Sequence, residues 1–439
     1  MGKKTIGVYW FTNDLRLDDN PLLAQAAQEV DQLICLYCLP SYSEYLKRFT
    51  SESHYGSARE RFWQQSVASL DQALNEKGQR LVVSQAHPFS ALAHLMSNDN
   101  ISALYCDDFV AHDERLIVQH LSCYFPLVKI CQRSQRTLFQ QFELPFTLDA
   151  LPASFTQFRK MVEGQSIALP HCAITNLPAP AKHSLETVTL PEVSVSSRDD
   201  FVGGEHFAHA HMMCYFSTSF ASRYKQTRNE LDGKENSTKF SPWLAVGSLS
   251  PSQIMHALNQ YEHRNGSNES TYWIFFELLW REYFQWYARK FGVSLFQRKG
   301  VQNKPPLTTF YPQRFKQWKM GNTEYPLVNA CMKQLNQTGY MSNRGRQLVA
   351  SCLIYELGID WRYGAAYMES QLVDYDVGSN WGNWQYIAGV GASRSARRFD
   401  QSKQAALYDP QREFVLRWNG NSSVATSDNV DMVDWPKRA

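Results

Sequence analysis

The sequence lacks several features that would place it in other classes of protein. It has no apolar run of the ~20 residues that cross a membrane, and its start does not resemble a signal peptide. Positive charge is not in excess, because 44 Lys and Arg residues meet 42 Asp and Glu residues and leave a formal net charge of +2. Any surface that binds nucleic acid must therefore be local. We expect a globular cytoplasmic protein that does not bind a membrane.

The nine cysteines do not predict disulfides or a metal centre. Their number is odd and their spacing does not repeat, unlike that of disulfide frameworks and zinc sites. Cys35 and Cys38 form a C-x-x-C pattern, but the apolar segment around them is typical of a buried strand. Residues three apart on a strand face opposite sides of a sheet. We therefore expect both to fill the core, and we predict no metal site.

A chain of 439 residues is long enough for two or more domains. Short apolar strands alternate with helices at first, a segment rich in proline and serine follows, and the later residues are almost entirely helical in pattern. Alternating strands and helices indicate a parallel, doubly wound sheet with helices on both faces. We predict an α/β domain over residues 1–130, a linker over 131–205, a large all-α domain over 206–418 and a flexible tail over 419–439. Helices expected in the all-α domain include residues 204–218, 223–232, 250–261, 271–291 and 343–357.

A cluster of hydroxyl groups and one lysine comes early in the helical region. Side-chain hydroxyls and free backbone N–H groups can hold a phosphate or diphosphate. An ordinary turn followed by a helix cap explains the same residues without any ligand. The cluster comprises Ser237, Thr238, Lys239, Phe240 and Ser241.

Glu277, Trp280 and Arg281 have the spacing i, i+3, i+4, so they share one face of an expected helix. A carboxylate, a flat aromatic ring and a guanidinium there suit a nucleobase, which they can hydrogen-bond, stack on and clamp through its phosphate. The alternative is a core tryptophan flanked by surface ion pairs.

Residues 340–386 carry the densest mixture of charged, amide and aromatic side chains. Asn343 and Gln347 are one helical turn apart and can line one cavity. One of Arg344 and Arg346 can reach a DNA phosphate while the other pairs with an aspartate, for which the candidates are Asp374 and Asp376. Arg397 and Arg398 follow, and with Arg344 they can form a local basic face. Helix caps and a solvated charge run are the alternatives.

Trp361 and Trp384, with Trp318, can relay single electrons if they lie close together, because indole is oxidisable within the range of an excited flavin. Core packing is the more usual role of tryptophan.

These segments together resemble the photolyase/cryptochrome family over nearly the whole chain. Residues 10–21 look like the opening of the family, and residues 237–244, 277–284, 340–347 and 374–386 match its flavin domain. Residues 341–347, 374–384 and 403–410 are most similar to the cryptochrome DASH branch.

The resemblance implies that FAD binds in the helical domain. Tyr224 and residues 237–241 would hold the diphosphate and the ribityl chain, with Glu277 and Arg281 also counted as cofactor contacts. Arg346 would pair with Asp374 beside the flavin ring, Asp376 would sit near the ring edge or the ribose, and Asn380 would face the flavin N5. Trp384 and Trp361 would carry electrons to the flavin.

The implied reaction is the blue-light-driven splitting of cyclobutane pyrimidine dimers, with single-stranded DNA as the partner and RNA left open. Tyr386 stands where duplex-repairing relatives carry a larger tryptophan, so contacts in the pocket offset less of the free energy that extruding a dimer from a duplex costs. The protein is expected to act as a monomer. The lesion contacts would be Glu277, Trp280, Asn343, Gln347 and Tyr386, and the candidates for DNA phosphates are Arg281, Arg344, Arg397 and Arg398.

The family also carries an antenna, usually 5,10-methenyltetrahydrofolate. Asp113 and Glu114 match the position that holds the pterin. A carboxylate there can accept hydrogen bonds from the amino and ring N–H groups of the pterin. Acidic residues favoured by a helix dipole are the alternative explanation.

One position departs from the family pattern, and it concerns the outer tryptophan expected about ten residues before Trp318. Residues 307–311 contain no tryptophan, so Tyr311 or Trp318 is left as the last step of the relay. A 6-4 photoproduct enzyme needs a histidine near the lesion, but the last histidine is His263. A blue-light signalling protein without useful repair is the main alternative function; a plain nucleotide-binding protein leaves the helical half unexplained.

Overall fold

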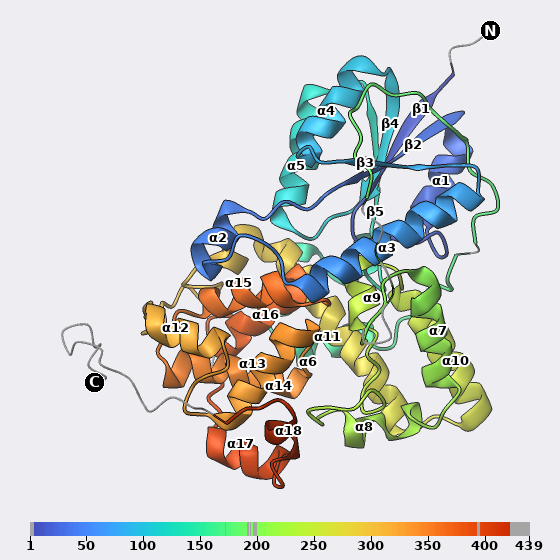
Figure 1. Cartoon of the computed structure of the whole chain (residues 1–439). Helices are drawn as coiled ribbons and strands as arrows, with labels where there is room; N and C mark the ends of the chain where they lie inside the picture. Colours follow the sequence, from blue (N-terminus) through green and yellow to red (C-terminus); the bar gives the residue numbers. More distant parts are fainter. Residues whose placement is uncertain are drawn as a thin grey trace. The chain divides into compact units, whose positions relative to one another are not determined.

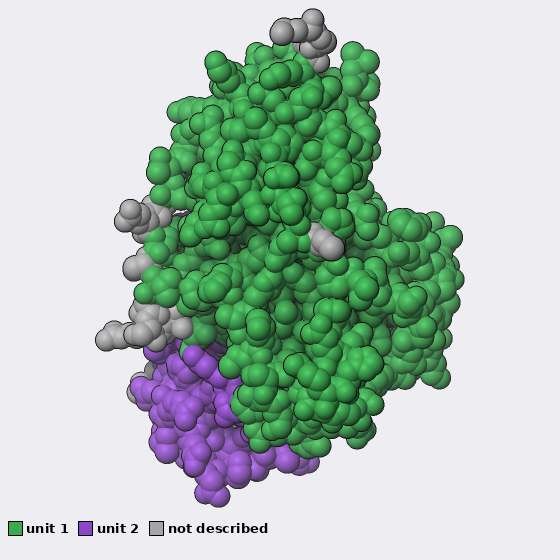
Figure 2. All heavy atoms as spheres, turned by 90° about the vertical axis from the view of Figure 1, so that its right-hand side faces the viewer, with its two compact units in different colours: residues 1–42, 59–226, 237–292 green, residues 43–58, 227–236, 293–439 purple. Residues whose placement is uncertain are grey.

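The computed structural model describes residues 4–171, 173–190, 193, 195, 200–392 and 396–421. The chain divides into two compact units, coloured separately in Figure 2. Unit 1 comprises residues 1–42, 59–226 and 237–292, and unit 2 comprises residues 43–58, 227–236 and 293–439. Within the described ranges, no helix is both long enough and apolar enough to cross a membrane. The tail predicted over residues 419–439 lies outside the described residues from 422 onward.

Unit 1 is built on a parallel sheet whose inner strands are largely apolar and buried, as expected for strands covered on both faces, whereas the edge strand over Lys129–Arg133 is mostly polar. The strand order is β3-β2-β1-β4-β5, and Val8 of the central strand lies opposite Ile34 and Leu104 of its neighbours (Figure 1). The strands are β1 (Ile6–Phe11), β2 (Gln32–Cys38), β3 (Leu81–Ser84), β4 (Ile101–Asp107) and β5 (Lys129–Arg133), with the short β6 (Ala179–Pro180) pairing with β2.

Helices cover both faces of this sheet, which confirms the predicted doubly wound α/β fold. Residues of α1 (Pro21–Glu29) and α3 (Ser57–Glu76) pack into one core, and those of α4 (Pro88–Asn98) and α5 (His112–Tyr124) into the other. Cys35 belongs to the first core and Cys38 to the second. Burial raises the pKa of the Cys38 thiol to about 12, so both cysteines are core residues as predicted.

The rest of unit 1 is mainly helical, and α11 is its longest helix. The predicted helix over residues 223–232 is wrong beyond its first turn, because the chain turns where Thr227 Oγ1 donates a hydrogen bond to the carbonyl of Asn236. The short helix over Ser241–Val246 was not among the predicted helices. The helices are α6 (Phe155–Val162), α7 (Glu205–Phe216), α8 (Tyr224–Thr227), α9 (Ser241–Val246), α10 (Pro251–Asn265) and α11 (Glu269–Phe291).

The described part of unit 2 is mainly helical, and α2 (Glu44–Thr50) packs against α15 (Trp361–Gln371) in it (Figure 1). The predicted helix over residues 343–357 is α-helical only to Ser351. It continues as a π-turn over Cys352–Glu356, with Leu357 N bonded to the carbonyl of Cys352. The helices are α2 (Glu44–Thr50), α12 (Pro312–Lys319), α13 (Pro326–Thr338), α14 (Asn343–Ser351), α15 (Trp361–Gln371), α16 (Val377–Ala388), α17 (Gln401–Tyr408) and α18 (Glu413–Arg417).

Candidate functional site

Arg346 and Asp374 form an ion pair in unit 2, which confirms the predicted pairing. A guanidinium nitrogen of Arg346 lies 2.7 Å from Asp374 Oδ2, and its Nε donates to the carbonyl of Met341 at 2.9 Å. The Asp374 side chain is only 3% exposed. Burial disfavours the guanidinium charge, but the neighbouring carboxylate outweighs it and raises the pKa of Arg346. The ion pair therefore fixes the start of α14 against residue 374.

The two helices that carry the predicted flavin and lesion residues begin at side-chain caps. Ser342 Oγ accepts from the backbone N–H of Gly345 at 3.1 Å and starts α14. Asp376 Oδ1 accepts from the N–H of Ser379 at 2.7 Å and starts α16. Such caps satisfy N–H groups that the first turn leaves without a partner. One oxygen of the buried Asp376 therefore serves the helix itself.

Asn380 lies on α16, buried, with its amide oriented by the neighbouring helix. Its Nδ2 donates to the backbone carbonyl of Ala365 on α15 at 3.0 Å. A carbonyl oxygen can only accept, so the nitrogen end of the amide must face it. Within the residues that the structure describes, no group donates to Asn380 Oδ1. The arrangement presents an acceptor of fixed orientation and no charge.

A cluster of tryptophans in unit 2 lies around α15, namely Trp318, Trp361, Trp381 and Trp384. A Cβ on Gly364 would lie 2.2 Å from the ring of Trp384, so this ring rests on the helix one turn after Trp361. The rings of Trp384 and Trp318 meet edge to face with centroids 6.3 Å apart, and those of Trp361 and Trp381 are 5.8 Å apart. All are buried. The sequence did not single out Trp381.

The predicted lesion contacts of unit 2 lie on α14 and α16. Asn343 is exposed and Gln347 is half-buried one turn later. Tyr386 is half-buried near the end of α16, with the guanidinium of Arg397 5.2 Å from its ring centroid. This cation–π contact joins a candidate for DNA phosphates to a candidate lesion contact.

Arg344 and Arg398 have protein partners of different kinds. Arg344 is half-buried, 4.7 Å from the ring centroid of Tyr408, and burial lowers its pKa. Arg398 makes two hydrogen bonds to the carboxylate of Glu356, at 3.0 and 3.1 Å. Arg398 could bind a phosphate only after its hydrogen bonds to Glu356 are broken.

Glu277, Trp280 and Arg281 of unit 1 lie on α11, all half-buried. The Trp280 ring stacks on Phe155 with centroids 3.7 Å apart and an angle of 13°. Arg281 donates to the backbone carbonyls of Arg136 and, at 3.5 Å, of Leu244. The guanidinium of Arg281 therefore holds three segments of unit 1 together, which the i, i+4 spacing could not reveal.

The next residue on α11, Glu282, was not predicted as functional. It is buried and accepts from the N–H of Leu138 at 2.7 Å and from Trp286 Nε1 at 2.7 Å. Burial raises the pKa of its carboxyl to about 7 although these bonds oppose the shift. The only sequence signal for Glu282 is its position among apolar residues in the middle of a long helix.

The predicted phosphate cluster lies in the loop that leads into α9. Ser237, Thr238 and Ser241 are half-buried, and Lys239 has a left-handed backbone with φ of +53°. The carbonyl of Thr238 bonds to His211 at 2.8 Å. Phe240 is buried and anchors the loop in the core, and Tyr224 is buried at the start of α8.

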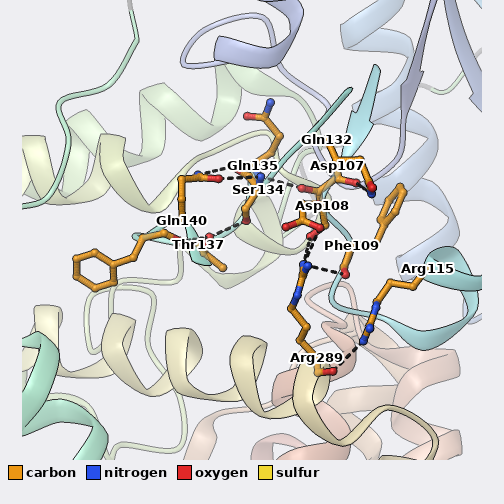
Figure 3. A network of polar contacts seen from close by, with 11 residues as sticks. Asp107, Asp108, Phe109, Arg115, Gln132, Ser134, Gln135, Thr137, Gln140 and Arg289 are labelled. Carbon is orange, nitrogen blue, oxygen red and sulfur yellow. Dashed lines mark hydrogen bonds and ion pairs between the residues drawn. The ribbon is translucent and has the colours of Figure 1, made fainter. Parts of the chain in front are cut away.

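The predicted antenna residues lie in the first turn of α5, beside a polar network of unit 1 (Figure 3). Arg115 donates to the carbonyl of Arg289 at 2.8 Å, and Arg289 pairs with Asp108 at 2.7 Å. Asp113 is exposed, whereas Glu114 is half-buried and burial raises its pKa. No side chain in the described part of the chain donates a hydrogen bond to the Glu114 carboxylate.

One group of potential metal ligands in unit 1 was not predicted. Asp18, Glu205 and His209 each place a ligand atom within 4.8 Å of the others. Both oxygens of Glu205 already accept backbone N–H groups, from Leu17 and Asp18 at 2.9 Å. Glu205 and His209 are four apart on α7, and this spacing was the available signal.

Comparison with known proteins gives the same assignment over the whole chain. Residues 7–181 match a family model described as DNA photolyase, and residues 273–430 match the FAD-binding domain of DNA photolyase. Cryptochrome DASH of Vibrio parahaemolyticus is 54% identical over 99% of this chain and 98% of its own. The crystal structure of a Synechocystis cryptochrome matches with a TM-score of 0.86 and 38% identity over 95% of this chain and 89% of its own. A class III photolyase of Agrobacterium tumefaciens matches with a TM-score of 0.80 and 26% identity over 95% of this chain and 87% of its own.

Proposed function

Because this chain belongs to the photolyase/cryptochrome family, in the branch of the proteins named cryptochrome DASH, we propose that it uses blue light to split cyclobutane pyrimidine dimers in single-stranded DNA. When bound in its reduced form, FAD would supply the photochemistry, in which one electron is lent to the dimer and returned after the ring opens. The protein has to hold the cofactor, keep water away and position the lesion.

The observation that carries this proposal is the fixed amide of Asn380. Its nitrogen is engaged by Ala365, so its oxygen is the end left to accept from a flavin N5–H. An amide does this without adding a negative charge beside a reduced, anionic flavin. The Arg346–Asp374 ion pair would lie beside the flavin ring, where the guanidinium offers hydrogen-bond donors to the cofactor. These donors and acceptors fit the flavin that the family model implies.

Lesion binding is assigned to the residues that the resemblance indicates. The carboxylate of Glu277 would bond to a base edge of the dimer, and Trp280 and Tyr386 would form apolar walls, with Asn343 and Gln347 offering amides. Because Tyr386 is smaller than a tryptophan, its contacts with the lesion are weaker and offset less of the few kcal/mol that unpairing a duplex costs. Single strands, in which that cost is small, are therefore the preferred substrate.

Among the arginines proposed for DNA phosphates, Arg397 has the most suitable surroundings. Its guanidinium lies over the ring of Tyr386, a lesion candidate. Arg281 already binds two backbone carbonyls, and Arg398 already binds Glu356. We therefore rank Arg397 and the half-buried Arg344 above the other two.

The antenna is proposed to be 5,10-methenyltetrahydrofolate, with Glu114 as its carboxylate ligand. A half-buried carboxylate with a raised pKa and no side-chain donor suits the amino and ring N–H groups of a pterin. The exposed Asp113 is the weaker candidate.

The repair proposal is tested with the FAD-loaded protein, chemically reduced and illuminated with blue light. Oligonucleotides with one thymine dimer are supplied single-stranded or annealed to a complement, and restored thymines are separated by chromatography. Efficient repair of the single strand and poor repair of the duplex support the proposal. A protein that keeps FAD reduced but repairs neither substrate fits the signalling alternative instead.

A further inference from the structure

Unit 2 contains a cavity of about 580 Å³. None of the residues assigned above to the flavin or to the lesion lines this cavity. It lies between α2, the start of α15 and the segment before α12. Its volume falls in the range of pockets that hold one small molecule. The residues that matter are the aromatic Phe49, Phe310 and Tyr363 and the arginines Arg48, Arg298 and Arg362.

Positive charge is in excess around the cavity, where three arginines meet two carboxylates. Asp360 is engaged by Arg362 at 2.7 Å, with Arg298 3.9 Å away. Glu44 pairs with Lys47 at 2.5 Å. Arg48 is exposed at the cavity and makes no hydrogen bond or ion pair with any residue that the structure describes. It is the cation that an anionic ligand would meet first.

The aromatic side of the cavity is flat and partly open. The rings of Phe310 and Tyr363 stack 4.1 Å apart at 13°, and Phe49 lies 4.9 Å from Tyr363. Phe310 and Tyr363 are only half-buried. Half-exposed stacked rings beside guanidinium groups are the combination that binds a base and its phosphate.

The cavity also adjoins the tryptophans of unit 2. Trp361 lies between two lining residues, Asp360 and Arg362, and its indole N–H donates to the carbonyl of Arg298 at 3.2 Å. Tyr45, another lining residue, is 5.8 Å from the ring of Trp381. A ligand in the cavity should therefore change tryptophan emission.

We propose that this cavity binds a nucleoside phosphate, with Arg48 at the phosphate and the base against Phe310. The chemistry is common to a free nucleotide and to a nucleotide of a single strand, and the test separates these sources. The site is independent of the flavin and lesion residues, so it stands whether or not the protein repairs DNA.

The test is a titration of the FAD-loaded protein with adenosine monophosphate, in which binding is measured by calorimetry and by the change in tryptophan emission. We expect a dissociation constant below about 1 mM. Arg48→Ala should weaken binding at least tenfold, whereas Lys316→Ala, which removes an exposed cation on α12 that does not line the cavity, should leave it unchanged. Equal affinity in Arg48→Ala and in the unaltered protein overturns the proposal, as does the absence of binding.

Thr308 allows a second test inside the cavity. Its hydroxyl is buried without a hydrogen-bond partner among the described residues, so Thr308→Val loses no bond and should bind normally. Thr308→Trp places a large ring in the cavity and should abolish binding; retained affinity in a folded variant contradicts the site. Inorganic phosphate binding as tightly as the nucleotide would remove the aromatic part of the proposal. If an undamaged single-stranded oligonucleotide displaces adenosine monophosphate, a nucleotide of a single strand is the source of the ligand. If the oligonucleotide does not displace it, the free nucleotide is the source.

Discussion

The side-chain amide of Asn380 donates a hydrogen bond to the backbone carbonyl of Ala365 at 3.0 Å, joining α16 to α15. This bond settles which end of the amide remains available. It links the fold of unit 2 to its proposed chemistry, because an uncharged acceptor of fixed direction suits a reduced flavin. The same bond provides the most specific substitution test.

Replacing Asn380 with aspartate should lower the midpoint potential of bound FAD. A carboxylate adds negative charge beside the flavin, and it cannot donate to Ala365. We expect a fall of about 60 mV or more, equivalent to ~1.4 kcal/mol for one electron. A redox titration followed by flavin absorbance measures it. Asn383→Asp, on the exposed side of the same helix, should leave the potential almost unchanged; equal shifts in both variants would refute the role of Asn380.

Asp374→Asn should destabilise the protein and reduce its FAD content. Removing one partner of a buried ion pair leaves Arg346 uncompensated and costs about 3 kcal/mol. Denaturant unfolding and the ratio of flavin to protein absorbance measure the two effects. The comparison is Arg398→Ala, which breaks the more exposed pair with Glu356 and should cost about 1 kcal/mol or less. A stable, fully loaded Asp374→Asn protein would be inconsistent with our account.

Gly364→Ala should slow the photoreduction of FAD. The added methyl would lie 2.2 Å from the Trp384 ring, so that ring must move, at a cost of about 1–3 kcal/mol in stability. Trp384→Phe should slow photoreduction too, while chemically reduced enzyme keeps most of its repair. Transient absorption after a light pulse measures the rate. Gly164→Ala, where nothing lies within 4 Å, is the control; a normal rate in the Gly364 variant would argue against the relay.

Glu277→Ala should lower the repair yield without loss of FAD, because we assign this carboxylate to the lesion. Repair per photon and flavin content are measured on the same sample. Glu269→Ala, at the start of the same helix and paired on the surface with Lys225, should retain full repair. Loss of FAD in the Glu277 variant would move this residue from the substrate to the cofactor.

The stability of the protein should fall as pH rises from about 4.5 to 7. The pKa of the Glu282 carboxyl is raised to about 7, so the folded state holds a proton that the unfolded chain releases at lower pH. The loss amounts to about 2–3 kcal/mol. Glu205 and Asp107, whose pKa values burial raises to about 7, act in the same direction. Urea unfolding at pH 5 and pH 7 should show a smaller difference in Glu282→Gln; an unchanged difference would contradict this assignment.

The sequence was informative where a local pattern determines the structure. Apolar strands alternating with helices predicted the sheet of unit 1, and the matching motifs predicted that Arg346 pairs with Asp374. It failed where partners come from distant segments. Arg281 binds the carbonyl of Arg136, 145 residues earlier, and no spacing on α11 indicates this. The π-turn after Ser351 was missed for a different reason, because its hydrogen bond spans five residues instead of four and the helical pattern does not signal this local change.

The most direct test of the central claim is light-dependent repair of a thymine dimer in a single strand by the reduced, FAD-loaded protein. Matched samples are kept dark or illuminated, and intact thymines are counted against the flavin present. Our account predicts restoration only in the illuminated sample, with much less when the same strand is in a duplex. Bound, reduced flavin without any light-dependent restoration in the single strand would contradict it.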